Sequence, residues 1–339
     1  MLLKRLTESR GVSGDEEEVR ALIREEVASL ADQVYVDRIG NLIAVKMGKK
    51  LDKKVMLSAH MDEVGLIITG IGENGMLRFH TIGGMDERIL VSKRVLIGPG
   101  RIPGVIGAKA IHLQEPDERT KALKQSQLYI DIGVTGKEGA EKLVKLGDYV
   151  IFDSPYVEFG EDLVKAKALD DRVGCAIAVE MLREQYDFTL VAAFTVQEEV
   201  GLRGAEVAAY HIEPDLALVL EGTTCSDVAG VEEHLQATRI GRGPALSIMD
   251  RSSIANQDVL NKLVDTANRY GMPYQYRETT MGGNDAGRIH ISRAGVPTAS
   301  VSVPCRYIHS PVSVCSKTDF DNCARLVKAF LMNSAVELL

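Results

Sequence analysis

The sequence predicts an α/β protein in which a three-layer α/β/α domain is interrupted by a small β-rich domain. Apolar runs alternate with helical patterns near both ends of the chain, which is typical of strands buried between two layers of helices. Between residues 66 and 158, short and closely spaced β-like runs predict a small barrel or sandwich instead. We therefore expect a discontinuous domain formed by residues 1–65 and 159–339, and an inserted barrel-like domain formed by residues 66–158.

The N-terminal segment supplies a helical pattern and three strands before the insertion begins. From Leu6 to Ala31 the pattern is helical, and acidic residues stand ahead of its periodic apolar positions, as in the first turn of a helix. Runs over 33–37 and 41–46, on either side of a short turn, predict a pair of strands. A third strand, over 55–59, leads directly into His60.

The alternating α/β pattern returns after residue 160. Asp170 and Asp171 precede a helical pattern, and an apolar strand over 190–196 leads to Glu198 and Glu199. The other elements expected in this part are helices over 204–210, 257–270 and 319–331, and strands over 216–220 and 298–303. Within the insertion we expect strands over 66–68, 76–79, 94–97, 104–107 and 128–131.

The composition indicates a globular protein of the cytoplasm. Of the 339 residues, 45% are hydrophobic and 26% are charged, which are ordinary values. A formal net charge of -8 and the lack of a Lys/Arg cluster argue against nucleic-acid binding. No apolar run approaches the ~20 residues of a membrane span, and the N-terminus lacks a signal-peptide core. Five cysteines without paired spacing fit a reducing compartment, so we expect neither a nucleic-acid nor a membrane partner.

Potential metal ligands follow four of the apolar strands. These are His60, the pair Glu198 and Glu199, Glu221 and His309, and the acids at 170 and 171 stand at the start of a helix. Each alone is more often a solvated side chain than a ligand. Because open α/β sheets place their chemistry at the carboxyl ends of the strands, we expect these side chains to converge. Converging charges at apolar strands need compensation, which divalent cations provide.

This set of residue types fits two zinc-like ions that share one bridging carboxylate. Each ion would take one His, the bridging Asp and one Glu, leaving room for a shared water of lowered pKa that acts as the nucleophile. Ligands with nitrogen and oxygen but no thiolate fit Zn, Co or Mn. A carboxylate that binds no metal would take a proton from that water, and Asp62 could hold the ring of His60 in one tautomer. Spacing does not distinguish Asp170 from Asp171 as the bridge.

Five motifs in order resemble the cocatalytic dimetal aminopeptidases, the family of glutamyl and tetrahedral aminopeptidases, some of which carry endoglucanase labels. The resemblance spans essentially the whole chain and rests on segments 60–65, 168–174, 196–201, 221–222 and 307–310. It implies the metal ligands His60, Asp170, Glu199, Glu221 and His309, with Asp170 as the bridge. It also implies that Glu198 is the general base, that Asp62 supports His60, and that the 170–171 peptide bond is cis. At position 221 many members carry Asp where this chain has Glu.

The resemblance further implies activity and assembly. The family removes N-terminal residues from short peptides, and it assembles into dodecamers shaped like a hollow tetrahedron, with dimers built by the inserted domain. We therefore expect a cytoplasmic metal-dependent aminopeptidase that forms large homo-oligomers. A basic residue near the site would favour Glu or Asp as the N-terminal residue.

Other functions need different site features. A deacylase or a carboxypeptidase is the nearest alternative, since Arg251, Arg277 or Arg288 could bind a substrate carboxylate. An endoglucanase would need two carboxylates around a sugar and no metal-binding His, and aromatic residues make up only 5% with no Trp. A metal-stabilised scaffold or peptide-binding protein is a further alternative. Structural metal sites are usually closed and often rich in thiolates, whereas the candidate ligands here include no Cys and have a spare Glu beside them. The Gly-rich loop over 281–287 either lines the substrate cleft or only turns the chain.

Overall fold

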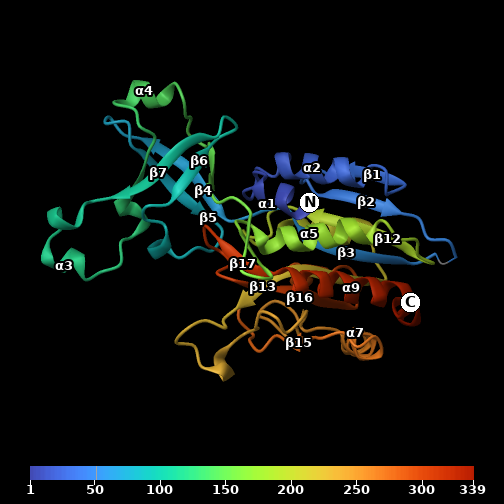
Figure 1. Cartoon of the computed structure of the whole chain (residues 1–339). Helices are drawn as coiled ribbons and strands as arrows, with labels where there is room; N and C mark the ends of the chain where they lie inside the picture. The colour runs from blue at the N-terminus through green and yellow to red at the C-terminus, as the bar shows by residue number, and fades with distance from the viewer. Residues whose placement is uncertain (51) are drawn as a thin grey trace.

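In the computed structural model, which describes residues 1–50 and 52–339, one large mixed sheet forms the centre of the molecule (Figure 1). Its strand order is β1-β2-β12-β3-β13-β16-β17-β11-β10, and β14 and β15 extend it from β16. The strands are β1 (Gln33–Val36), β2 (Leu42–Lys46), β3 (Lys54–His60), β10 (Val157–Phe159), β11 (Leu163–Ala166), β12 (Thr189–Thr195), β13 (Leu216–Cys225), β14 (Ala245–Leu246), β15 (Gln275–Tyr276), β16 (Thr298–Arg306) and β17 (Ser313–Ser316).

The four central strands β12, β3, β13 and β16 are parallel, so their carboxyl ends meet at one edge of the sheet. In register, Thr195 of β12 lies beside His60, the last residue of β3. On the other side of β3, Val219 of β13 pairs with Ser58, which brings Glu221 level with His60. The register therefore brings residues far apart in sequence to one edge.

Helices cover both faces of this sheet, because alternate residues of each central strand point to opposite sides. In β12, for example, Leu190, Ala192 and Phe194 join one apolar cluster, whereas Val191 and Ala193 join another. The first cluster is closed by α1 (Leu2–Glu8), α2 (Glu17–Val27), α5 (Leu169–Met181), α7 (Gln257–Arg269) and α9 (Lys317–Asn333), and the second by α6 (Arg203–Ile212) and α8 (Ala286–Ile289). This confirms the predicted three-layer α/β/α arrangement.

A closed six-stranded barrel projects from one end of the sheet, as Figure 1 shows. It has an apolar core of its own, separate from the two clusters that flank the sheet. Its order is β4-β5-β8-β7-β6-β9, and α3 (Pro116–Arg119) and α4 (Lys137–Glu141) lie in its connections. The strands are β4 (Gly65–Ile71), β5 (Leu77–Ile82), β6 (Arg94–Ile97), β7 (Ile102–Ala108), β8 (Leu128–Asp131) and β9 (Tyr149–Phe152). Of the two predicted alternatives, barrel and sandwich, the barrel is the observed one.

Two of the expected elements were wrong in extent. The predicted helix over 6–31 is two helices, because Val12 forms a β-bridge with Glu63 and Gly14 has a φ of +92°. The predicted strand over 216–220 continues to Cys225 as β13, so Glu221 lies within a strand and not after one. No helix in the described part of the chain is long and apolar enough to cross a membrane.

Candidate metal centre

The structure brings the seven sequence-predicted site residues together at the carboxyl edge of the sheet. His60 ends β3, Glu221 lies in β13, and Asp170 is the second residue of α5. Glu198 and Glu199 follow β12, and His309 lies in the loop between β16 and β17. Asp62 follows His60 and is fully buried.

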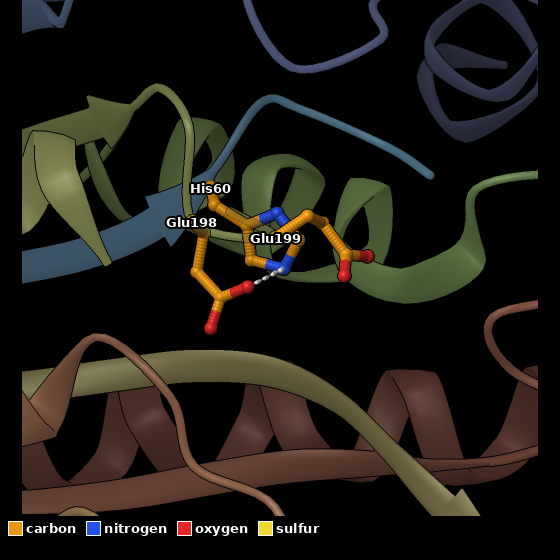
Figure 2. A group of neighbouring side chains, drawn as sticks. All are labelled: His60, Glu198 and Glu199. Atoms are coloured by element: carbon orange, nitrogen blue, oxygen red, sulfur yellow. Dashed lines mark ion pairs between the residues drawn. The ribbon is translucent and has the colours of Figure 1, made fainter. Parts of the chain in front are cut away.

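One half of the centre surrounds the imidazole of His60. Its Nε2 lies 3.3 Å from Asp170 Oδ1, 3.6 Å from Glu221 Oε2 and 4.0 Å from Glu198 Oε2. Figure 2 shows the Glu198 carboxylate directed at this nitrogen, while Glu199 points to the other side of the ring. His60 Nδ1 contacts the backbone oxygen of Asp62 at 3.0 Å, so Nε2 is the ring nitrogen that faces the acids.

The other half surrounds His309. Its Nε2 lies 3.4 Å from Glu199 Oε2 and 3.5 Å from Asp170 Oδ2. Nδ1 of the same ring contacts the backbone oxygen of Gly84, from the barrel domain, at 2.9 Å. Asp170 therefore directs one carboxylate oxygen to each histidine and lies between the two halves.

The neighbouring acid, Asp171, is used differently. It is fully buried, and its carboxylate accepts backbone N–H groups from His60 at 3.1 Å and from Gly174 at 2.9 Å. The peptide bond between Asp170 and Asp171 is cis, as the resemblance implied. Of the two adjacent acids, only Asp170 has both oxygens directed at the histidines, and spacing in the sequence does not reveal this difference.

The carboxylate oxygens at the centre are better suited to binding a cation than to lying next to one another without one. Asp170 Oδ1 and Glu221 Oε1 are buried and accept no hydrogen bond in the described part of the chain. Burial raises the pKa of Glu198 and of Glu221 well above the ordinary value, and it raises the pKa of Glu199 to about 7. Burial therefore disfavours the charged forms of these carboxylates, and bound divalent cations would offset that cost. Three groups of acids and histidines here have ligand atoms within 4.8 Å of one another.

Asp62 orders the segment that carries the two glutamates. Its carboxylate accepts the backbone N–H of Glu198 at 2.9 Å and that of Glu199 at 3.1 Å, and the hydroxyl of Ser13 donates to it at 2.6 Å. Its Oδ1 lies 3.5 Å from His60 Nδ1, farther than its own backbone oxygen. The hydrogen bonds of the Asp62 carboxylate to Glu198 and Glu199 were not predicted from the sequence, and its support of the His60 ring stays a prediction.

A buried ion cluster next to the site was not predicted. Glu63 lies 2.6 Å from Lys167 Nζ and 3.2 Å from Arg172 Nη2, and all three side chains are nearly inaccessible to solvent. Lys167 also donates to the backbone of Ser9, and Arg172 to that of Met61. The cluster joins the segment after His60 to both sides of the Asp170 turn. The available signal was that Glu63 and Arg172 lie inside two of the motifs and Lys167 directly precedes one of them.

A cavity of about 310 Å³ opens beside the centre and is lined by both histidines, Asp170, Glu198 and Glu221. Four residues of the Gly-rich loop, 281–284, also line it, so this loop borders the site. Of the three arginines considered as carboxylate ligands, Arg277 lines the cavity, whereas Arg251 and Arg288 do not.

Asp285, from the Gly-rich loop, is fully buried and accepts hydrogen bonds from Ser58 and Thr195 at 2.8 and 2.6 Å. It links β3 to β12 just before they reach the centre, and the sequence analysis missed it.

Curated relatives align with nearly the whole chain. Residues 40–326 match the M42 glutamyl aminopeptidase family. A relative from Acetivibrio thermocellus is 42% identical over 328 residues, which cover 96% of each chain. The lysyl aminopeptidase of Pyrococcus furiosus is 31% identical, over 97% of this chain and 96% of its own.

Solved structures of similar proteins also match nearly the whole chain. The TET aminopeptidase of Thaumarchaeota archaeon SCGC AB-539-E09 superimposes with a TM-score of 0.96 and 37% identity, over 99% of this chain and 96% of its own. The TET1 peptidase of Pyrococcus horikoshii, described as assembling into a tetrahedron or a large octahedral shell, gives 0.86 and 33% over 98% of both chains. A Thermotoga maritima protein described as an endoglucanase gives 0.83 and 35%, over 99% and 98%. The chain belongs to the M42 glutamyl aminopeptidase family, whose members are metallopeptidases, and it is an aminopeptidase.

Proposed function

We propose that this aminopeptidase removes N-terminal residues from short peptides with two divalent cations bound at the centre. His60, Asp170 and Glu221 would hold one cation, and His309, Asp170 and Glu199 the other. The observation that carries the proposal is the position of Asp170, whose two oxygens face different histidines at 3.3 and 3.5 Å. A carboxylate in this position can bridge two ions.

Bound cations would lower the pKa of a water at the centre and polarise the carbonyl group of the first peptide bond. Their ligands are nitrogen and oxygen atoms without a thiolate, a set suited to Zn, Co or Mn. Glu221 can take the place that Asp holds in many members, because its Oε2 already lies 3.6 Å from His60 Nε2.

Glu198 is proposed as the general base. It lines the cavity beside the centre, and its assignment leaves one Glu for each cation. Its carboxylate would accept a proton from the attacking water and deliver that proton to the leaving amine nitrogen. Burial raises the pKa of Glu198, and shifted pKa values of buried acids are typical of functional sites. The backbone bond from Glu198 to Asp62 holds this residue in place.

Carbohydrate hydrolysis is not favoured, although one similar structure is described as an endoglucanase. Among the described residues that line the cavity there is no Phe, Tyr or Trp for a sugar ring to stack on. Glycosidases also use two carboxylates without histidine-bound metals. A carboxypeptidase would use a cation such as Arg277 to bind the C-terminal carboxylate of its substrate. Unlike an aminopeptidase, it would not cleave aminoacyl-p-nitroanilides or Leu-Gly-amide, which lack that carboxylate.

For assembly, we propose that the barrel domain forms dimers and that dimers build a tetrahedral dodecamer. The Pyrococcus horikoshii relative is described as assembling into a tetrahedron or an octahedral shell, and the similar structure named PhTET1-12s is described as a dodecamer. Large apolar side chains are exposed on the inserted domain, which supports a contact surface there. They include Val105, Ile111, Leu113, Leu143 and Leu146. Light scattering coupled to size-exclusion chromatography tests this, and a monomer at micromolar concentration would contradict it. All five cysteines are buried and free, which supports a reducing compartment such as the cytoplasm.

The function is tested with a panel of aminoacyl-p-nitroanilides and peptide amides, assayed beside cello-oligosaccharides. We expect metal-dependent release of the N-terminal residue and no cleavage of the sugars. Blocking the α-amino group by acetylation should abolish hydrolysis. Equal cleavage of acetylated and free peptides would point to a different amide hydrolase.

A further inference from the structure

Arg277 stands at the wall of the cavity, directly after β15, and its guanidinium is held in place by neutral groups. Nε donates to Thr223 Oγ1 at 3.0 Å, and Nη1 donates to the backbone oxygen of Thr279 at 2.9 Å. Nη2 donates to the backbone oxygen of Met281, in the Gly-rich loop. Thr223 lies two residues beyond Glu221 on β13, so Arg277 is fixed close to the proposed metal centre.

Arg277 forms no ion pair with any described acidic residue. Within residues 1–50 and 52–339, no described carboxylate oxygen lies within 4.0 Å of the Arg277 guanidinium, although Arg172 and Arg306 each have such a partner. Burial lowers the pKa of Arg277, while an arginine remains charged under all physiological conditions. A partly buried charge without a counter-ion is unfavourable, which indicates that a ligand completes it.

Among the described residues that line the cavity, Asp250 is the acid outside the metal centre, and its Oδ1 is held by hydrogen bonds within its own turn. Its Oδ1 accepts the backbone N–H groups of Ser252 and Ser253, each at 2.7 Å, and the hydroxyl of Ser252 at 2.9 Å. These three donors hold Oδ1 in the turn over 250–253. Asp250 therefore offsets part of the local charge from a distance, without pairing with Arg277.

The donor inventory of Arg277 leaves room for a ligand. A guanidinium has five N–H groups, of which three are used here, so one remains on each terminal nitrogen. Free N–H groups of a guanidinium favour a carboxylate as their acceptor. We infer that Arg277 binds a carboxylate of the peptide substrate, in a subsite of the cavity beside the metal centre. This inference rests on the proposed function.

A substrate carboxylate has two sources. It is either the side chain of an N-terminal Glu or Asp, or the C-terminal carboxylate of a very short peptide. Family membership does not decide between them, because relatives include enzymes named for glutamyl and for lysyl substrates. The recognition chemistry at Arg277 is the same in both cases.

Two matched substrate pairs distinguish the sources in the metal-loaded, full-length enzyme. Glu-p-nitroanilide against Gln-p-nitroanilide tests the side chain, and Leu-Gly against Leu-Gly-amide tests the C-terminus. We expect wild type to prefer the carboxylate member of one pair. Arg277→Gln should lower kcat/KM for that member about 10- to 100-fold, with the neutral member changed by only a few-fold. Arg251→Gln, an exposed arginine outside the cavity, is the matched control and should change neither.

Arg277→Lys separates recognition from folding, because it keeps the charge and loses the planar pair of donors. It should retain the carboxylate preference in part, with a raised KM for the preferred member. Equal losses on all four substrates would overturn the inference, and so would the absence of a carboxylate preference in both wild-type pairs. If wild type cleaves the neutral members only with metal present, the proposed function stands whatever Arg277 does.

Discussion

Asp62 Oδ1 accepts the backbone N–H of Glu198 at 2.9 Å, although the two residues are 136 positions apart. The bond ties the turn after β12 to the residues that follow β3, and Asp62 Oδ2 accepts the next N–H, from Glu199, at 3.1 Å. One buried carboxylate thus sets the positions of the proposed base and of a proposed ligand.

Asp62→Ala should therefore damage catalysis without unfolding the protein. We expect kcat/KM to fall about 10- to 100-fold, the usual cost of losing a group that orients metal ligands. Steady-state kinetics with metal analysis of the purified protein measures this effect. Ser13→Ala removes one of the donors to Asp62 and leaves its bonds to the glutamates, so it should cost much less. Wild-type kinetics in Asp62→Ala would remove this residue from the site.

Two adjacent substitutions separate proton transfer from metal binding. Glu198→Gln should lower kcat about 10²- to 10⁴-fold and retain both metals, because it removes a base that is not needed as a ligand. Glu199→Gln should reduce the metal content toward one ion per chain, since it removes a ligand close to His309. Inductively coupled plasma mass spectrometry counts the ions. The reversed pattern, with metal lost only in Glu198→Gln, would exchange the two assignments.

Metal removal should destabilise the protein as well as inactivate it, because the carboxylates near Asp170 lose their compensating charge. A ligand present at a thousand times its Kd contributes about 4 kcal/mol to the free energy of unfolding. Thermal unfolding with and without a chelator measures the difference, and re-added Zn, Co or Mn should restore Tm. Chelator saturated beforehand with the same ion is the control. An unchanged Tm with full loss of bound metal would contradict the expectation.

Glu63→Gln should be strongly destabilising, since it leaves Lys167 and Arg172 as buried cations without a carboxylate. Breaking a buried ion cluster in this way costs about 3–5 kcal/mol. Urea unfolding measures the free energy. Glu158→Gln breaks an exposed ion pair with Lys317 and should change the stability little, which makes it the matched control. Similar results for both variants would show that burial of the Glu63 cluster is unimportant.

Arg306, the last residue of β16, lies three residues before His309 and donates two hydrogen bonds to the carboxylate of Asp227. Nε lies 2.6 Å from Oδ1 and Nη2 lies 2.7 Å from Oδ2. Burial opposes ionisation of Asp227, but the bond from Arg306 prevails and holds its pKa below the ordinary value of 3.8. A lowered pKa stabilises the folded state above the unfolded-state pKa, and this stability is lost as pH falls through the folded value. Asp227→Asn should cost about 1–3 kcal/mol near pH 7.

The difference in unfolding free energy between wild type and Asp227→Asn should stay constant from neutral pH to about pH 5, and shrink below pH 4. Chemical unfolding across this range measures it. Arg306→Lys keeps the charge but not the bidentate geometry, and should give an intermediate loss. A difference that grows as the pH falls would contradict the proposed linkage.

The sequence by itself determined the layers and the edge at which the chemistry gathers. Burial on both faces produces continuous apolar strands such as Leu190–Phe194, and polar residues at their carboxyl ends are visible without coordinates. His60, Glu198 and Glu199 could be named for this reason. These features depend on local periodicity, which sequence records directly.

Only the tertiary structure decided how adjacent or similar residues differ. Asp170 and Asp171 are equivalent in sequence, and the path of the backbone turns one carboxylate to the histidines and the other to backbone N–H groups. Likewise Arg277 lines the cavity and Arg251 does not, because a bond to Thr223 on β13 holds the former beside the site. Such differences depend on strand register and on contacts between distant segments, and neither is encoded in a local pattern.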